Sequence, residues 1–189
     1  MLTAKLPMTA QIQQQHSSVG ALQHLTVKLQ QLTNLLTLPQ CDTSHLITEV
    51  EAALVSLQVE QLHQQAIASC VWDFFPTPQS VIEQMLSLAK ITPGMKILEP
   101  SAGLGHICRE VRKLQVEPDC FELSPLLRQG LLLQRFNVIG DNFLSSTPTP
   151  IYDRILANPP FSQNGVARHT LYALDWLRPG GRLVTVTTT

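Results

Sequence analysis

The strongest indication of the fold in this sequence is Lys96-Ile97-Leu98-Glu99-Pro100-Ser101-Ala102-Gly103-Leu104-Gly105. Its first four residues form a short aliphatic run that ends on a carboxylate, which is typical of a buried strand. A Gly-rich turn follows, and a helix is expected from there through Leu114. A strand, a tight glycine turn and a helix in this order form the opening unit of a doubly wound α/β sheet.

The sequence after this unit keeps alternating between strand and helix. Ser124 and Pro125 form the N-cap and first position of a helix, and another helix is expected over about 164–177, closed by Pro179-Gly180-Gly181. Further strands are expected at 120–122, 136–140, 152–157 and 182–188. This alternation predicts an α/β domain with a doubly wound, mostly parallel sheet, whose ligands bind at the carboxyl ends of the strands.

Residues 1–70 have a different character from residues 71–189, so we expect two domains. The first 70 residues are rich in Gln and Leu and contain no aromatic residue except histidine. Before Pro39, leucines recur at steps of three and four, and a second apolar stripe follows the turn at Cys41-Asp42-Thr43-Ser44. The two stripes predict an antiparallel helical hairpin over 9–69 that packs on its own domain, on a second copy or on another protein. The stripe residues are Leu22, Leu25, Leu29, Leu32 and Leu36, then Leu46, Val50, Leu54 and Leu57.

Composition sets loose bounds on function. The net charge of −1 over 189 residues provides no general attraction to nucleic acid. The N-terminus lacks a basic region followed by an apolar run, and no segment is long and apolar enough for a bilayer, so we expect a cytoplasmic protein that does not bind membranes. The cysteines contain no Cys-x-x-Cys pair, which argues against disulfides and metal sites and predicts small buried side chains. They are Cys41, Cys70, Cys108 and Cys120.

The turn after the first strand is suited to a cationic, nucleoside-like cofactor. Gly103 and Gly105 lack the Cβ that would block the close approach of a ligand. Glu99 ends the strand with a carboxylate, which would repel a dinucleotide pyrophosphate but attract a cofactor with amino and sulfonium groups. Glu122 ends the second strand and is placed to accept hydrogen bonds from ribose hydroxyls. Asp141-Asn142-Phe143, after the third strand, offers polar groups and an apolar wall for an adenine ring.

Phe74-Phe75-Pro76-Thr77-Pro78 lies just before another predicted helix. Thr77 is expected to be the N-cap and Pro78 the first helical residue. Capping does not explain the two aromatic residues, Phe74 and Phe75, which we expect to form an apolar lid over the methionine part of the cofactor.

Asn158-Pro159-Pro160-Phe161 follows the fourth strand and is suited to holding a planar amino group. The lone pair of a conjugated amino nitrogen is delocalised, which makes it a poor nucleophile. The Asn158 side-chain oxygen and a carbonyl of the Pro159-Pro160 turn could each accept one N–H hydrogen and favour the pyramidal form. Phe161 would stack on the substrate. Together with the glycine turn, this points to methyl transfer from S-adenosylmethionine to such a nitrogen, with no metal ion.

Residues 73–189 resemble the catalytic domain of the amino-methylating, Rossmann-type methyltransferases, and they are most similar to the DNA adenine methylases. The resemblance rests on the order of the motifs quoted above. It implies S-adenosylmethionine as cofactor and Asn158, Pro159, Pro160 and Phe161 as the catalytic motif. It also implies a set of cofactor-binding residues: Phe75, Thr77, Pro78, Glu99, Pro100, Ala102, Gly103, Gly105, Glu122, Asp141, Asn142, Phe143 and Asn158.

Two features depart from this family's pattern. Where members commonly have Asp-Phe-Leu after the third strand, this chain has Asn142-Phe143-Leu144, and Asp141 is displaced by one position. Either Asp141 or Asn142 could therefore face the adenine. The family's sheet also continues with an antiparallel hairpin beyond the fifth strand, which this sequence does not contain. Residues 182–186 would then form an exposed apolar edge.

Three functions remain open on the sequence. The first is methylation of adenine in DNA, or of a base in RNA as a close variant. The second is methylation of glutamine in a protein, although that class favours Asp-x-Gly-x-Gly in the first motif and Tyr at the position of Phe161. The third is a cofactor-binding protein with little activity of its own, which is completed by a partner protein or a second copy through the N-terminal helices or the last strand.

Overall fold

The computed structural model describes residues 23, 26, 27, 29–31, 34, 44–71 and 74–187. The chain divides into two compact units, Met1–Gln61 and Leu62–Thr189. The boundary lies inside the long helix α2 (Ser44–Ala68), a few residues before the division at residue 70 that the composition predicts. Each unit is described by itself.

In the first unit, α2 provides the second of the two predicted helices. Val50 is buried, whereas Leu54 is 45% exposed and lies off the buried stripe to which the sequence assigned it. The other predicted helix falls on residues of which only a few are described, and Leu22, Leu25, Leu32 and Leu36 lie outside them. The predicted hairpin therefore stays a prediction.

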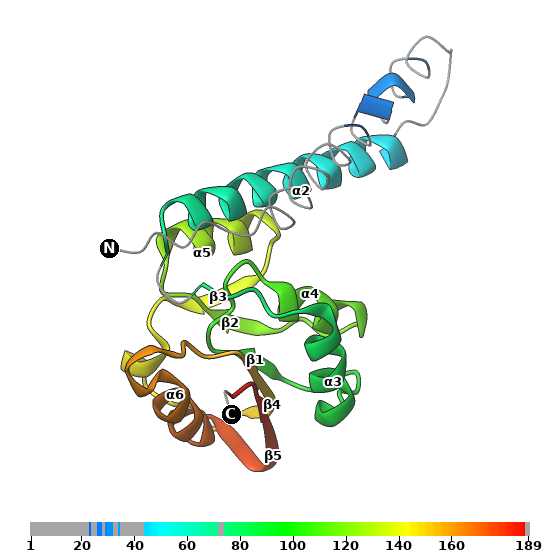
Figure 1. The fold of residues 1–189 in the computed structure, drawn as a ribbon. Helices are drawn as coiled ribbons and strands as arrows, with labels where there is room; N and C mark the ends of the chain where they lie inside the picture. The colour runs from blue at the N-terminus through cyan, green and yellow to red at the C-terminus, as the bar shows by residue number, and fades with distance from the viewer. Residues whose placement is uncertain are drawn as a thin grey trace. The chain divides into compact units, whose positions relative to one another are not determined.

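The second unit contains a five-stranded parallel sheet (Figure 1). The strand order is β3-β2-β1-β4-β5, and every pairing is parallel. The order reverses between β1 and β4, which is the position where doubly wound sheets bind ligands. This confirms the predicted fold class. The strands are β1 (Ile97–Glu99), β2 (Asp119–Phe121), β3 (Asn137–Gly140), β4 (Tyr152–Ala157) and β5 (Leu177–Thr185).

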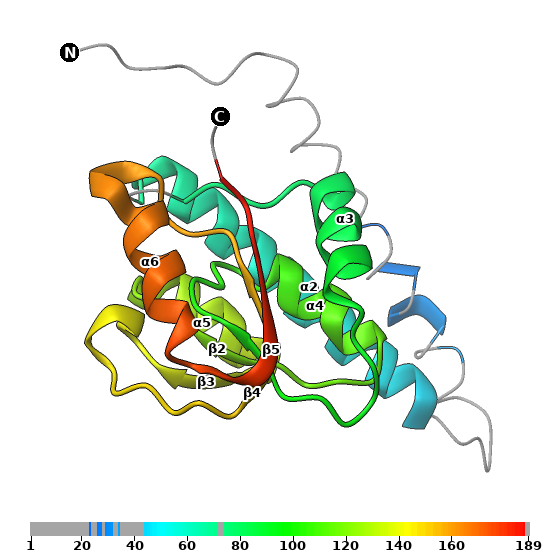
Figure 2. The same cartoon turned by 90° about the horizontal axis from the view of Figure 1, so that it is seen from below.

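Helices cover both faces of this sheet, and Figure 2 shows α3 and α6 on opposite sides of it. Neighbouring strand residues point to opposite faces. Ile97 and Leu156 accordingly pack with α3 and α4, whereas Leu98 and Ile155 pack with α6 and Trp176. The helices are α3 (Gln79–Ala89), α4 (His106–Lys113), α5 (Pro125–Leu133) and α6 (Gly165–Leu174), with short 3₁₀ turns η1 (Phe143–Ser145) and η2 (Ser162–Asn164).

The start of α5 agrees with the sequence. Ser124 is its N-cap and accepts a hydrogen bond from the Leu127 N–H at 3.4 Å, and Pro125 occupies the first helical position. The Ser124 hydroxyl accepts from an N–H that would otherwise be free, and Pro125 has no N–H that needs an acceptor. Together they fix where the helix begins.

The segment between α6 and β5 differs from the prediction. α6 ends at Leu174, and β5 already begins at Leu177, so Pro179-Gly180-Gly181 lies within the strand rather than closing the helix. Tyr152 pairs with Leu177, but Arg154 pairs with Arg182, so the residues between Leu177 and Arg182 bulge out of the ladder. Burial of Trp176 against the sheet ends the helix early, and Gly180, at φ +79°, allows the bulge.

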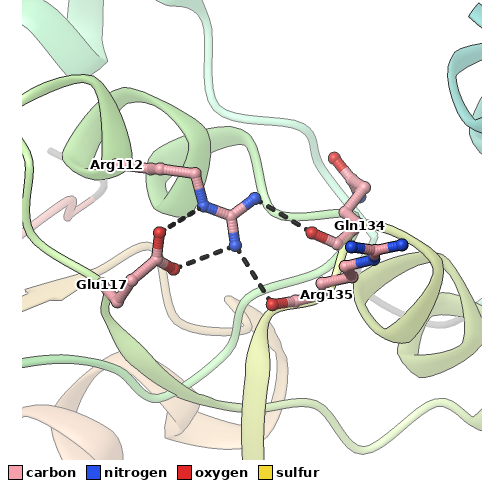
Figure 3. A network of polar contacts seen from close by, with 4 residues as sticks. All are labelled: Arg112, Glu117, Gln134 and Arg135. Atoms are coloured by element: carbon pink, nitrogen blue, oxygen red, sulfur yellow. Dashed lines mark hydrogen bonds and ion pairs between the residues drawn. The ribbon is translucent and has the colours of Figure 1, made fainter. Parts of the chain in front are cut away.

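Arg112 connects α4 to the segment between α5 and β3 (Figure 3). Its guanidinium donates to both Glu117 carboxylate oxygens, at 2.7 and 2.9 Å. It also donates to the backbone carbonyls of Gln134 and Arg135, at 2.9 and 3.2 Å. The guanidinium carbon lies 3.8 Å from the ring centre of Phe136, where it makes a cation–π contact.

Cysteine burial follows the prediction in part. Cys108 and Cys120 are buried, but Cys70 is exposed, so the expectation of a buried side chain is wrong there. Cys70 lies in the turn after α2, at φ +48°, where its N–H donates to the Ile67 carbonyl. Among the helices that the structure describes, none has the length and apolar character needed to cross a membrane.

Candidate functional site

Two cavities lie at the carboxyl ends of the strands in the second unit, and Ser101 and Glu122 line both of them. The larger cavity has a volume of about 530 Å³ and the smaller about 50 Å³. Of the residues that the sequence predicts for the site, the smaller cavity is lined by Phe75, Thr77, Glu99, Ala102, Gly103, Glu122 and Asn158. The larger is lined by Pro100, Glu122, Asp141, Asn142, Phe143 and Pro160.

Four predicted residues line neither cavity: Pro78, Gly105, Pro159 and Phe161. Pro78 precedes α3, and Pro159 is fully buried. Gly105 faces the core: a Cβ there would meet Phe136 at 2.9 Å and Leu131 at 3.0 Å. Its left-handed conformation at φ +79° and this close packing require a glycine, whereas the sequence had attributed it to the approach of a ligand.

Gly103 lies directly in the smaller cavity, at φ +56°. A Cβ there would come within 3.3 Å of the Phe74 ring. The Gly103 N–H donates to Glu122 Oε2 at 2.7 Å, and the Ser124 N–H donates to Glu122 Oε1 at 2.8 Å. A carboxylate has about four lone-pair sites, so Glu122 keeps acceptor capacity toward the cavity. Burial raises the pKa of Glu122, and the two N–H donors oppose that shift.

Glu99 is the most deeply buried carboxylate of the site, with 3% of its surface exposed. Burial raises its pKa to about 8, and the Cys108 thiol, which donates to Oε2 at 2.8 Å, counteracts part of this effect. The pKa of Cys108 is itself raised by burial, so the thiol keeps its proton. Near neutral pH a large fraction of Glu99 is therefore protonated, and a cation placed beside it would favour the ionised form.

Asn158 lies just beyond β4 and is oriented by two acceptors from the segment before α3. Its Nδ2 donates to the Phe75 carbonyl at 3.1 Å and to the Thr77 hydroxyl oxygen at 3.0 Å. These bonds identify which side-chain atom is nitrogen and which is oxygen. The Oδ1 atom is buried and has no hydrogen-bond partner in the described part of the chain. A buried acceptor without a donor is costly, which marks it as a position for a donor from a ligand.

Thr77 does not cap α3, which corrects the prediction. Pro78 is the N-cap residue, with extended backbone and no side-chain cap, and Gln79 is the first helical residue. Thr77 therefore lies one residue too early to bond the first free N–H groups. Its buried hydroxyl instead holds Asn158, at a sequence separation of 81.

Two aromatic residues, Phe74 and Phe75, line the smaller cavity together with Asn158. The Phe75 ring is 60% exposed and lies 6.0 Å from the ring of Phe161, at an interplanar angle of 55°. Phe74 lies against the Gly103 turn and packs edge-on against His63, with ring centres 5.6 Å apart.

Both candidates for the residue that faces an adenine line the larger cavity. The Asn142 side-chain oxygen accepts from the Leu144 N–H at 3.1 Å and caps η1. Asp141 Oδ1 accepts from the Asn142 N–H at 2.7 Å. Both side chains keep polar atoms for a ligand. Phe143 is buried in the core cluster under α6 and presents only part of its ring to the cavity.

Seven further lining residues lie outside the motifs identified from the sequence: His106, Leu123, Leu127, Ser162, Gly165, Arg168 and His169. Leu123 is 67% exposed. Its position directly after Glu122, at the end of a predicted strand, could have indicated that it lines the site. His169 stacks on Phe143 with ring centres 5.9 Å apart, and its Nδ1 is 2.8 Å from the Gly165 carbonyl. Burial lowers the pKa of His169. The pKa of His106 is lowered to about 4, mainly by burial and to a smaller extent by electrostatic repulsion from Arg109 and His63.

No family model matches the chain. A methyltransferase dependent on S-adenosylmethionine from Thiobacillus denitrificans, solved with S-adenosylhomocysteine, matches with a TM-score of 0.50 and 17% identity over 64% of this chain and 53% of that one. An RNA methyltransferase from Salinibacter ruber, also solved with S-adenosylhomocysteine, matches with a TM-score of 0.47 and 20% identity over 59% of this chain and 76% of that one. The glycopeptide N-methyltransferase MtfA, solved with sinefungin, matches with a TM-score of 0.48 and 16% identity over 60% of this chain and 55% of that one.

At 17% identity, the likeness to the Thiobacillus denitrificans protein shows the fold alone, that of a class I methyltransferase. The matched region corresponds to about half the length of two of these three proteins.

Proposed function

We propose that this chain is a methyltransferase that uses S-adenosylmethionine to methylate an exocyclic amino group, with adenine in DNA as the favoured substrate. The observation that carries the proposal is the unpartnered Oδ1 of Asn158. Asn158 follows the carboxyl end of β4, the strand next to β1, and lines the same cavity as Glu99 and Gly103.

The residues of the two cavities fit this cofactor. The Glu99 carboxylate suits the ammonium and sulfonium charges, because a buried acid gains most from a nearby cation. The free lone pairs of Glu122 suit ribose hydroxyls, and the larger cavity beside Asp141, Asn142 and Leu123 suits an adenine. When bound, the cofactor supplies an electrophilic methyl group.

Asn158 would act on the nitrogen that receives this methyl group. Its Oδ1 accepts one N–H of the substrate amino group, and a carbonyl of the Pro159-Pro160 turn accepts the other. Two fixed acceptors draw the hydrogens out of the plane of the conjugated group and direct the nitrogen lone pair toward the methyl group. Phe75 and Thr77 prevent the Asn158 amide from turning, because they hold its Nδ2.

The preference for DNA adenine rests on the resemblance of residues 73–189 to that class. A base in a duplex would have to be flipped out of the stack to reach Asn158. In the larger cavity, Arg168 is the one lysine or arginine among the described lining residues, and it could contact a phosphate.

A second candidate function is a protein that binds the cofactor and needs a partner chain or second copy for activity. The observation that favours it is β5, which has one neighbour, β4, among the described strands. No other strand of the described residues pairs with its outer edge, where a further strand could be added. The predicted helical hairpin of residues 1–70 would be another surface for such an assembly.

The test is methyl transfer from radiolabelled S-adenosylmethionine to three substrates: adenine-containing DNA, RNA of the same base sequence, and a glutamine peptide. The proposal expects N6-methyladenine in the DNA with the wild-type chain, and about 10²–10³-fold slower formation with Asn158→Ala. Labelled glutamine or labelled RNA alone would reject DNA as the substrate. Activity that appears only after a second polypeptide is added would establish the partner-dependent function.

A further inference from the structure

Two contacts fix the orientation of the His169 ring in α6. Its Nδ1 lies 2.8 Å from the carbonyl oxygen of Gly165, four residues earlier in the same helix. Because a carbonyl oxygen can only accept a hydrogen bond, Nδ1 carries the proton of the neutral ring and Nε2 carries the lone pair. One face of the ring stacks on Phe143, with an interplanar angle of 21°. The fold therefore determines both the tautomer and the plane of the ring.

The Nε2 atom of His169 is left available as a hydrogen-bond acceptor. It has no hydrogen-bond partner in the described part of the chain, and it is not fully buried. Burial lowers the pKa of His169, the bond to the Gly165 carbonyl partly opposes this effect, and the charge of Arg168 adds to it. The other charged side chains that line the larger cavity are Glu122 and Asp141. At pH 7.5 the ring is therefore neutral, and Nε2 accepts rather than donates.

His169 lies at the part of the larger cavity that the proposed function assigns to an adenine. Phe143, on which it stacks, directly follows Asp141 and Asn142, and all four residues line this cavity. Leu123, which is 67% exposed, gives the same cavity an apolar wall for a flat ring. The sole free acceptor of the His169 ring is therefore available beside a space suited to a purine.

We infer that His169 is a specificity-determining residue for the cofactor, and that its Nε2 accepts an N–H from the 6-amino group of the adenine. This rests on the proposed function and adds a contact from α6 to those that the strand ends supply. On the edges of adenine, the 6-amino group donates hydrogen bonds, whereas the ring nitrogens only accept. The neutral Nε2 has no proton to donate, so it can pair only with the amino group.

A purine with a 6-oxo group would be disfavoured at this position. Its oxygen would face the Nε2 lone pair with no proton between the two atoms, so each acceptor would lose water without gaining a new bond. S-inosylhomocysteine differs from S-adenosylhomocysteine only in this base. Since the two ligands share their ribose and ammonium groups, the ratio of their affinities reports the base alone and not the contacts of Glu99 and Glu122.

The experiment is calorimetric titration of the full chain with both ligands at pH 7.5. The variant is His169→Phe, which keeps a ring that can stack on Phe143 but has no acceptor. The matched control is Thr170→Val at the next position of α6, which lines neither cavity. Wild type and Thr170→Val should prefer S-adenosylhomocysteine about tenfold, and His169→Phe should lower this preference to about twofold or less by weakening S-adenosylhomocysteine.

A second measurement uses the wild-type chain and does not depend on the folding of a variant. Nitrogen NMR of the chain with labelled histidine distinguishes protonated from unprotonated ring nitrogens, and the His169 resonances are assigned through their bonds to the backbone. S-adenosylhomocysteine should shift the Nε2 resonance toward that of a protonated nitrogen, because Nε2 then accepts a hydrogen bond. S-inosylhomocysteine should leave it in place.

Equal loss of both affinities in His169→Phe would overturn the inference and make His169 structural. A preference that survives in that variant would also overturn it, as would a wild-type chain that binds both ligands equally or an Nε2 resonance that S-adenosylhomocysteine does not shift. Failure of the folded wild type to bind S-adenosylhomocysteine would instead reject the proposed function. A chain that prefers this ligand through His169 but methylates no DNA would reject the proposed substrate and support the inference.

Discussion

Among single residues, Asn158 and Thr77 are expected to have different roles, which mutation can distinguish: Asn158 accepts the substrate N–H, and Thr77 orients Asn158. Asn158→Ala removes the acceptor for the substrate N–H, and we expect kcat to fall by about 10²–10³-fold, as for the loss of one preorganised hydrogen-bonding group in other active sites. Thr77→Val keeps the size of the side chain but removes the hydroxyl that holds Asn158 Nδ2. It should lower kcat by a smaller factor, through misorientation of Asn158.

Calorimetry with S-adenosylhomocysteine serves as the control for both variants, and its Kd should stay within a few-fold of wild type. A parallel loss of cofactor affinity would mean that Asn158 is structural. Wild-type kcat in Thr77→Val would show that the hydrogen bond to Asn158 has no positioning role.

Glu99 predicts a pH dependence of stability. Its folded pKa of about 8 lies above the ordinary value of 4.5, so between these pH values the folded chain holds a proton that the unfolded chain has lost. The free energy of unfolding should therefore fall as pH rises from about 4.5 to about 8, by up to about 1.4 kcal/mol per pH unit. Urea denaturation at a series of pH values measures this slope.

Glu99→Gln is the matched variant, because it keeps the shape and cannot ionise. It should flatten the slope without abolishing it, since burial raises the pKa of Glu122 as well. The same ionisation predicts that S-adenosylhomocysteine binds more tightly as pH rises toward about 8, because its ammonium favours the charged form of Glu99. An unchanged slope in Glu99→Gln would show that Glu99 is already ionised in the folded chain.

Three glycines with positive φ can be compared directly. Gly94 has φ +86° and nothing within 4 Å of a Cβ, so Gly94→Ala reports backbone strain alone, about 1–2 kcal/mol. Gly105→Ala adds a clash with Phe136 and should cost more stability, with cofactor affinity unchanged. Gly103→Ala should cost about as much stability as Gly94→Ala but weaken S-adenosylhomocysteine, because Gly103 lines the smaller cavity. Thermal unfolding and calorimetry distinguish the three, and equal cofactor affinities in all three would remove Gly103 from the site.

At the scale of elements, the Arg112 contacts shown in Figure 3 determine how α4 is joined to the segment between α5 and β3. Arg112→Ala loses two carbonyl contacts, the Glu117 pair and the cation–π contact with Phe136, and should lower the free energy of unfolding by about 1–3 kcal/mol. Glu117→Gln loses only an exposed ion pair and should cost no more than about 1 kcal/mol. Equal effects in urea denaturation would mean that the carbonyl contacts contribute nothing.

The bounds of helices and strands could be predicted where residues close in sequence determine them. The Ser124 cap and Pro125 determine the start of α5, and the strand predicted over Tyr152–Ala157 has the observed bounds of β4. The end of α6 was not predictable, because Pro179-Gly180-Gly181 also terminates helices. Packing of Trp176 and pairing of Leu177 with Tyr152 decide that region, and both are tertiary contacts that local sequence does not record.

The candidate site, too, was predictable where it depends on local sequence and not where it depends on tertiary contacts. The motifs identified the strand ends that form it, because carboxyl ends of parallel strands meet at one edge. They did not show that Gly105 faces the core, that Thr77 holds Asn158, or that α6 contributes Arg168 and His169 to the larger cavity. Each of these depends on how distant segments pack.

For the molecule as a whole, the proposed function requires that the sheet of the second unit, Leu62–Thr189, binds the cofactor. Its central measurement is calorimetric titration of the purified chain with S-adenosylhomocysteine at pH 8, with Gly103→Val as the blocked control. We predict one site per chain with a micromolar Kd for wild type and no detectable heat for Gly103→Val. A wild-type chain that unfolds cooperatively, and is therefore folded, but binds no S-adenosylhomocysteine would contradict it.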